Sequence, residues 1–334
     1  MARYFPGGNT ASGFCSRFGD VLPEPERKRM IYLKGGPGVG KSSLMKRAAE
    51  RWEAAGERVD FFHCSSDPGS LDAIAVPERG FAVMDGTAPH VQDPVLPMAR
   101  DELINLADLL DADALKSRAG VIARLSGDIG RFFRRAYDYL AAAADVRRAA
   151  CRAAFKPQAV EPLLGELCEG LPLRGGWGRS RELFAEAYTP QGFVSLLEAP
   201  ETVISLEAPF GQTADPFLRA LANRLQSRGL SVTRLLDPLE PEKLAHLAVP
   251  AHGILITTAR LPGVAKLIPA DRLFDVPEGI EREQGFDRNA FELLTLRASE
   301  QIRQAKQLHD ELESFYTSAM DFSRWEALLQ RACP

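Results

Sequence analysis

The chain has 334 residues, 45% of them hydrophobic and 26% charged, and a formal net charge of -4, values typical of a globular protein with one large or two medium domains. The nearly balanced charge gives no reason to expect a nucleic-acid partner, and no apolar run approaches the ~20 residues that cross a membrane. Five scattered cysteines without a C-x-x-C pair argue against disulfides and structural zinc and, together with an N-terminus that lacks an apolar signal segment, predict a cytoplasmic protein.

The first well-defined segment is a strand, a glycine-rich loop and a helix. Residues 29–33 are an apolar run that predicts a buried strand, and residues 42–55 carry apolar side chains at helical spacing. The loop between them reads Gly35-Gly-Pro-Gly-Val-Gly-Lys41-Ser42 and fits the phosphate-binding pattern G-x-x-x-x-G-K-[ST] at every defined position. Strand, loop and helix in this order are the context that the pattern requires.

This loop predicts a nucleotide site, because glycines let successive backbone N–H groups turn inward around a phosphate. Lys41 would reach the β- and γ-phosphates, and the hydroxyl of Ser42 would bind Mg²⁺. The residues expected to bind the nucleotide are Gly35, Gly36, Pro37, Gly38, Val39, Gly40, Lys41, Ser42 and Ser43. The alternative is a glycine-rich turn without a ligand.

A second Mg²⁺-binding group is expected at the end of another buried strand. Residues 80–84 are such an apolar segment, and Asp85 follows it directly. We predict that Asp85 binds the metal, through a metal-bound water. The alternative is that Asp85 caps a turn with Gly86.

Two polar residues of the next segment, His90 and Asp93, could assist the attacking group or hold an acceptor. The catalytic candidates are therefore Lys41, Asp85 and His90. For His90 a structural role in the loop is the alternative.

The strand predicted around residues 59–64 ends near the same edge of the sheet, where ligands of open α/β sheets bind. Its polar residues His63 and Cys64, with the following Asp67, are candidates for the surroundings of an acceptor. We interpret Cys64 as a small buried residue rather than a nucleophile. A metal site that joins these three residues to His90 would match no known spacing.

The sequence contains an internal duplication. At an offset of 173, residues 56–89 match residues 229–262 at nine of 34 positions. Upstream, Phe5, Thr10, Gly13 and Phe14 align with Phe184, Thr189, Gly192 and Phe193. A repeat of this length describes two copies of a domain, and we predict an α/β fold of tandem P-loop NTPase-like parallel sheets flanked by helices, each with a helical extension.

The second copy has lost the features of the phosphate site. Thr213 stands where the first copy has Lys41, and Glu207 would bring a carboxylate towards a polyphosphate. Thr258 stands opposite Asp85. We interpret the second copy as non-catalytic, with a structural, regulatory or substrate-binding role.

The predicted domains are residues 1–156, with the nucleotide site, and residues 182–334, the degenerate copy, joined by a Gly/Pro-rich linker at 157–181. Residues 116–156 carry ten Lys/Arg and three Asp, whereas residues 271–313 carry eleven Asp/Glu and six Lys/Arg. The two regions either face each other or are solvated; a nucleic-acid footprint is the less favoured interpretation.

The chain resembles an uncharacterised family of bacterial two-repeat P-loop ATPases. The similar parts are Tyr4-Phe-x-Gly-Gly-Asn-Thr-x-x-Gly-Phe14, Lys34 to Ser43, His63 to Pro68, Met84 to Pro94 and Ile104-Asn-Leu106. The resemblance implies a duplicated P-loop fold and ATP binding by the first copy, and it implies no particular substrate.

The leading hypothesis is a Mg²⁺-dependent ATPase that binds and hydrolyses the nucleotide in its first copy. A small-molecule or nucleotide kinase is the first alternative, since the loop is compatible with an acceptor other than water. The second is a slow nucleotide-dependent switch that needs a protein partner or an arginine such as Arg260 for fast hydrolysis. ATP is preferred to GTP from the resemblance and from the lack of an Asn-Lys-x-Asp motif.

Overall fold

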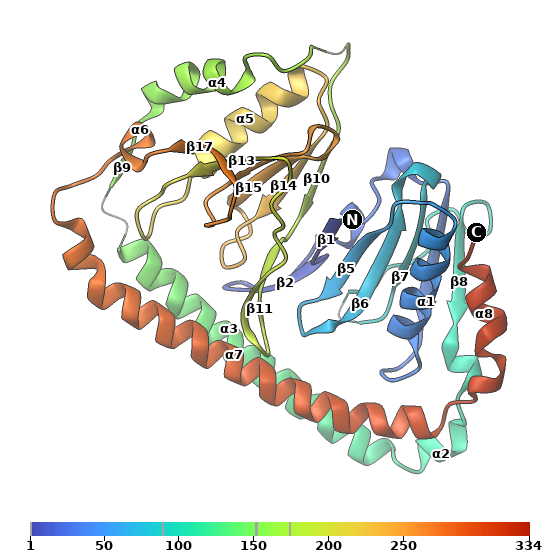
Figure 1. Cartoon of the computed structure of the whole chain (residues 1–334). Helices are drawn as coiled ribbons and strands as arrows, with labels where there is room; N and C mark the ends of the chain where they lie inside the picture. Colours follow the sequence, from blue (N-terminus) through green and yellow to red (C-terminus); the bar gives the residue numbers. More distant parts are fainter. Residues whose placement is uncertain (1, 89, 151–152, 174) are drawn as a thin grey trace.

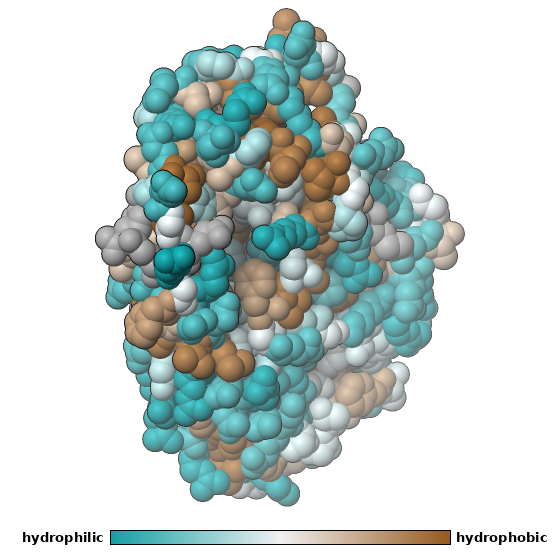
Figure 2. Space-filling view, turned by 60° about the vertical axis from the view of Figure 1, so that its left-hand side comes forward, coloured by the Kyte–Doolittle hydropathy of each residue, from teal (hydrophilic) through white to brown (hydrophobic). Residues whose placement is uncertain are grey.

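The computed structural model describes residues 2–88, 90–150, 153–173 and 175–334, so that Pro89, one of the repeat matches, and Cys151 lie outside the described residues. Two sheets with their own helices are joined by a pair of long helices along one side (Figure 1). Polar residues cover most of the face in Figure 2, where apolar residues gather in separate groups. No helix within the described ranges has both the length and the apolar character needed to span a bilayer.

The first sheet has six strands in the order β1-β5-β6-β7-β4-β8. They are β1 (Ala2–Tyr4), β4 (Arg29–Lys34), β5 (Asp60–Cys64), β6 (Asp67–Val76), β7 (Phe81–Asp85) and β8 (Asp101–Asn105). Strands β7 and β8 pair in parallel with β4, and β6 is antiparallel to both of its neighbours. Helix α1 (Lys41–Ala54) buries its apolar face, from Leu44 to Trp52, in the core on one side of this sheet.

The second sheet repeats this order as β10-β14-β15-β16-β13-β17. Its strands are β10 (Ser180–Leu183), β13 (Thr202–Leu206), β14 (Val232–Leu236), β15 (Leu244–Val249), β16 (Ile254–Thr257) and β17 (Val264–Ile268). Helix α5 (Asp215–Ser227) stands where α1 stands in the first half. The repeated glycines Gly80 and Gly253 have nearly the same left-handed backbone, with φ of 63° and 57°. This agreement is consistent with a duplicated α/β fold.

In each half a small hairpin follows the first strand of the sheet. Strands β2 (Gly7–Thr10) and β3 (Gly13–Ser16) form the first, and β11 (Glu186–Thr189) and β12 (Gly192–Ser195) form the second. The hydroxyls of Thr10 and Thr189 donate to the carbonyls of Gly13 and Gly192 at 2.7 and 2.9 Å. The aligned Thr-x-x-Gly segments therefore form the same turn.

Two expectations about the sheets are corrected. The sheets are mixed rather than parallel, because only Ser65 and Ser66 separate β5 from β6, and so short a connection can join only antiparallel strands. Leu103, Leu106 and Leu110 recur at helical spacing, which predicts a helix there, whereas residues 101–105 form β8, which pairs with β4. Pairing along the sheet edge outweighs the local periodicity there.

Helices α3 (Ala119–Ala149) and α7 (Ile280–Ser318) run side by side along both sheets (Figure 1). Their contact is apolar and includes Leu140 of α3 and Ile302 of α7. In the described part of the chain, their ion pairs lie within one helix or join a helix to a sheet. The oppositely charged regions therefore do pack together, but through apolar contacts rather than ion pairs.

The remaining α-helices and short strands lie outside the two six-stranded sheets. They are α2 (Ala112–Lys116), β9 (Ala154–Phe155), α4 (Val160–Cys168), α6 (Ala270–Leu273), β18 (Phe274–Asp275) and α8 (Trp325–Arg331). Helix α4 lies within the expected linker, yet it buries Leu163, Leu164 and Cys168 in the core of the second sheet. Helix α8 instead returns to the first sheet and packs on α1.

Candidate functional site

The glycine loop between β4 and α1 has the backbone that its sequence predicts. Gly38 and Gly40 have φ of 71° and 87°, and Gly35 has φ of 153°, conformations that side chains with a Cβ rarely adopt. Gly40 is the residue before α1, so the loop ends at the N-terminus of a helix. Such an end presents free backbone N–H groups and a partial positive charge.

Lys41 and Asp85 lie together at this loop, as the sequence predicts. The ammonium of Lys41 donates to the carbonyls of Gly35 and Gly36 at 2.7 and 3.0 Å, and it lies 3.3 Å from a carboxylate oxygen of Asp85. The register of the parallel pair β4–β7 sets Leu33 beside Asp85, which places the carboxylate at the start of the loop.

Asp85 also caps a turn, which is the role that the sequence offered as the alternative to metal binding. Its other carboxylate oxygen accepts from the backbone N–H of Thr87 at 2.8 Å, and the Thr87 hydroxyl donates to Gly35 at 3.1 Å. The hydroxyl oxygen of Ser42 accepts from the backbone N–H of Leu71 at 3.0 Å. Both Ser42 and Asp85 keep oxygen lone pairs free, as a Mg²⁺ ligand requires.

Asp72 on β6 is a member of this site that the sequence reasoning missed. The antiparallel pairing of Ala73 with Met84 places Asp72 beside Asp85, and only 7% of Asp72 is exposed. Burial, and then the charge of Asp85, raise the pKa of Asp72 from 3.8 to about 8. The available signal was an acidic residue inside the otherwise apolar run Leu71 to Val76. Asp72 and Asp85 thus bring two carboxyl groups side by side next to Lys41, and the raised pKa keeps Asp72 protonated at pH 7.

His90 lies near these charges but makes no hydrogen bond to them among the described residues. Its ring stacks on Phe18, with the centroids 4.4 Å apart and the planes 7° apart. Burial lowers the pKa of His90, so the imidazole is neutral at pH 7. Its Nδ1 is buried without a hydrogen-bond partner in the described structure. A neutral ring with a free nitrogen can accept a proton or orient a water.

Asp93 binds another lysine instead of reaching the loop. Its carboxylate lies 2.8 Å from the ammonium of Lys34, which also donates to the carbonyl of Gly86 at 2.7 Å. This pair fastens the segment after β7 to the end of β4.

The candidate side chains at the end of β5 and the start of β6 are paired or buried within the fold. His63 contacts the carbonyl of Pro68 at 2.9 Å, and burial lowers its pKa. Burial raises the pKa of the Cys64 thiol well above its usual value, which fits a buried residue rather than a nucleophile. Asp67 pairs with Lys306 of α7 at 3.4 Å.

These residues do not form the metal cluster that would join His63, Cys64, Asp67 and His90. Within the residues that the structure describes, the one group close enough to hold a metal is His309, Asp310 and Glu313 on α7. Consecutive turns of one helix bring these three together, and such exposed acidic groups are common without an ion.

The C-terminal part of the chain contacts the glycine loop, which no local signal in the sequence indicates. A Cβ at Gly36 would lie 2.4 Å from the ring of Tyr316, and one at Gly38 would lie 2.5 Å from the hydroxyl of Thr317. Thr317 donates to the carbonyl of Gly38 at 3.2 Å. Glycine is therefore required in the loop partly because the end of α7 lies against it.

The corresponding loop of the second half is covered by the other end of the helix pair. Phe210 packs edge-on against Phe291 at 5.5 Å and under the guanidinium of Arg288 at 4.7 Å. Gln284 of α7 donates to the carbonyl of Phe210 at 2.8 Å, and the amide of Gln212 donates to the carbonyl of Ala153. These contacts cover the loop with side chains of α7 and tie it to the segment after α3.

One contact of the first site survives in the second half with a different residue. Asp215 accepts from the backbone N–H of Leu244 at 2.7 Å, and the repeat pairs Leu244 with Leu71, which donates to Ser42. The hydroxyl of Thr258, which the repeat alignment pairs with Asp85, donates to the carbonyl of Ala245 on strand β15. The second half keeps the link between helix and strand, with a carboxylate in place of the Ser42 hydroxyl and a hydroxyl in place of the Asp85 carboxylate.

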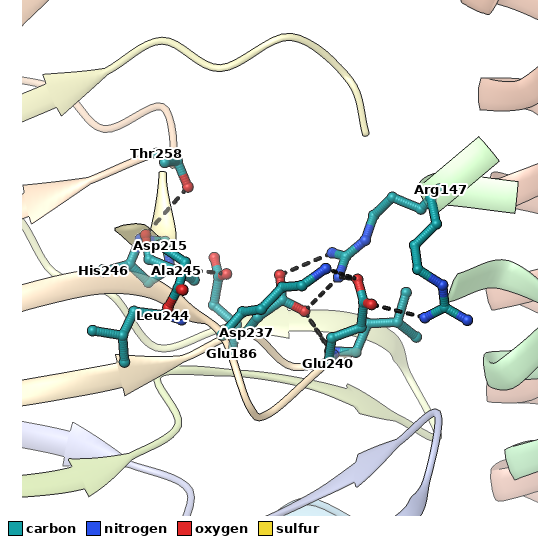
Figure 3. Close-up of polar contacts among 12 residues, drawn as sticks. Arg147, Glu186, Asp215, Asp237, Glu240, Leu244, Ala245, His246 and Thr258 are labelled. Atoms are coloured by element: carbon teal, nitrogen blue, oxygen red, sulfur yellow. Dashed lines mark hydrogen bonds and ion pairs between the residues drawn. The ribbon is translucent and has the colours of Figure 1, made fainter. Parts of the chain in front are cut away.

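A buried polar cluster fastens α3 to the second sheet (Figure 3). Arg147 binds Asp237 through two hydrogen bonds of 2.8 and 2.9 Å and also contacts Glu240. Next to them, His246 lies 3.0 Å from Glu186. All five side chains are largely buried and paired, which indicates a structural role.

Comparison of the chain with protein-family models, with curated proteins and with solved structures gave no match.

Proposed function

We propose that the first half binds ATP with Mg²⁺ at residues 35–43 and hydrolyses it, as a P-loop NTPase-like domain. The observation that carries the proposal is the position of Lys41, between the carbonyls of the glycine loop and the carboxylate of Asp85. At one helix N-terminus, a lysine can bind a polyphosphate and a carboxylate can bind the metal that accompanies it.

Each residue then has a role that follows from its contacts. The backbone N–H groups from Gly36 to Ser43 would hold the phosphates, and Lys41 would exchange its carbonyl partners for phosphate oxygens. Ser42 and Asp85 would hold Mg²⁺, which when bound neutralises charge on the β- and γ-phosphates. His90, whose pKa is lowered and whose Nδ1 has no partner among the described residues, would orient the attacking water.

The second half would not bind a nucleotide. It has Thr213 in place of Lys41, and its loop carries contacts from Gln284 and Phe291. The preference for ATP, and membership of the two-repeat P-loop family, rest on the resemblance of residues 1–110 and are part of this proposal.

A nucleotide-dependent switch with slow turnover is a second candidate function, and one observation favours it. The end of α7 contacts Gly36 and Gly38, so a change in the loop on nucleotide binding has a direct route to the helix pair. A switch would bind the nucleotide tightly and would release phosphate slowly until a partner protein accelerates hydrolysis.

The experiment that tests the proposal measures MgADP binding by calorimetry and phosphate release from MgATP. Wild type is compared with Asp85→Asn, and Asp138→Asn, exposed on α3, serves as the matched control. Binding with turnover that Asp85→Asn abolishes would support the ATPase, and binding without turnover would support the switch. The absence of nucleotide binding by the wild type would overturn both.

A further inference from the structure

The loop glycine next to Lys41 faces a tryptophan from the far end of the chain. A Cβ at Gly40 would lie 2.8 Å from Nε1 of Trp325, the first residue of α8. Trp325 is 8% exposed, and Arg47 lies over its ring at 5.1 Å. The indole therefore lies against the loop, with its nitrogen directed at it.

This indole N–H has no hydrogen-bond partner among the described residues. An indole N–H can only donate, and a buried donor that remains unpaired is costly, so each such group calls for a partner. Trp52, in the same core, shows the usual arrangement, because its N–H donates to the carbonyl of Ala332 at 3.0 Å.

The position of Trp325 is fixed by contacts that do not involve the loop. Glu326 next to it pairs with Arg47 at 2.9 Å and with Arg51 at 2.6 Å, both on α1. Leu329 and Ala332 are fully buried in the core that includes α1. The packing of α8 on α1 therefore fixes the unpaired N–H of Trp325 beside the loop.

A nucleotide in the loop would bring acceptors to this point, since its phosphate and ribose oxygens lie along the residues that precede α1. We propose that the N–H of Trp325 donates a hydrogen bond to an oxygen of the nucleotide bound at the glycine loop. This inference rests on the proposed nucleotide binding and adds to it that α8 is a wall of the site.

The test compares MgADP affinity, measured by calorimetry, for wild type, Trp325→Phe and Trp52→Phe. This substitution retains an aromatic ring in the core and removes only the indole N–H donor and part of the ring volume. We expect Trp325→Phe to weaken binding about tenfold, as the loss of one hydrogen bond to a charged group does. Trp52→Phe, whose N–H has a protein partner, should leave the affinity unchanged.

A second measurement uses the emission of Trp325. In a variant with Trp52→Phe and Trp177→Phe it is the sole tryptophan, and its emission should change on addition of MgADP and not when Lys41→Ala is also present. Wild-type binding with unchanged or tighter binding by Trp325→Phe would overturn this inference and leave the proposed function standing. No binding by the wild type would overturn both.

Discussion

The ammonium of Lys41 lies 3.3 Å from the carboxylate of Asp85 and 2.7 Å from the carbonyl of Gly35. One cation thus links the end of β7 to the first glycine of the loop. Asp85 ends β7 and Gly35 directly follows β4, and these strands are direct neighbours in the sheet, so the spacing is a consequence of the β4–β7 register.

Replacing Lys41 should weaken nucleotide binding. We expect Lys41→Ala to lower MgADP affinity at least tenfold, because it removes the only charged donor that the motif directs at the phosphates. Calorimetry measures this, with Lys46→Ala as control, since Lys46 lies on the same helix and donates to the carbonyl of Gly69 at 2.7 Å. Equal losses in both variants would contradict a specific role for Lys41.

Asp72 should make stability depend on pH. Its pKa is about 8 in the folded protein, against ~4 in an unfolded chain, so between these values the folded state holds a proton that the unfolded state has released. The free energy of unfolding should therefore fall as the pH rises through this window. Asp72→Asn, a neutral replacement, should gain stability relative to wild type as the pH rises.

Urea denaturation of wild type and Asp72→Asn at about pH 5 and about pH 8.5 measures this difference. The exposed Asp138→Asn should show no such trend. If the difference between Asp72→Asn and wild type were the same at both pH values, Asp72 would not carry a raised pKa.

The contact between the loop and Tyr316 can be tested by adding a single methyl group. Gly36→Ala would place its Cβ 2.4 Å from the Tyr316 ring, and we expect a destabilisation of about 1–3 kcal/mol. The cost should shrink in a Tyr316→Ala background, where the ring is absent. Gly120→Ala, in open space on α3, is the matched control and should be neutral or stabilising.

Arg147 should contribute far more to stability than an exposed arginine of the same helix. Arg147→Met would leave the buried carboxylates of Asp237 and Glu240 short of a partner, and we expect a loss of about 3–5 kcal/mol. Arg131→Met breaks an exposed pair with Asp128 and should cost less than about 1 kcal/mol. Chemical denaturation compares the two, and similar losses would contradict a structural role for the cluster.

Glu240 should in addition make the protein sensitive to acid. Although burial opposes it, the hydrogen bonds from Arg147, Arg148 and Lys243 lower the pKa of Glu240 from 4.5 to about 2. The stability that this carboxylate contributes is present above the unfolded pKa and is lost as the pH falls towards 2. Glu240→Gln should lose less stability than wild type between about pH 5 and about pH 3 in urea titrations, and an identical loss would contradict this.

The sequence predicts those parts of the site whose signals are local. The strand before the loop, the loop and α1 lie where the periodicity and the glycine pattern indicate, and Asp85 ends its strand as expected. The antiparallel direction of β6 follows from the two-residue connection after β5, because so short a connection excludes a parallel crossover.

The residues that the sequence did not reveal depend on tertiary structure. Asp72 becomes part of the site only through the register of β6 against β7, which brings two carboxylates together. Trp325 reaches Gly40 only because the chain returns from the second sheet along α7. No pattern within a short stretch of sequence encodes this return of the chain to the first sheet. An alternation of polar and apolar residues cannot distinguish a contact with one sheet from a contact with the other.

Helix α7 has 39 residues and is therefore a rod of about 58 Å. One end is fixed by Gln284 and Phe291 to the eroded loop, and the other rests through Tyr316 and Thr317 on the intact loop. If the proposed nucleotide binding shifts the first loop, a helix held in this way would turn about its contacts with the second loop. The loop of the second half would then be the fixed point of that movement.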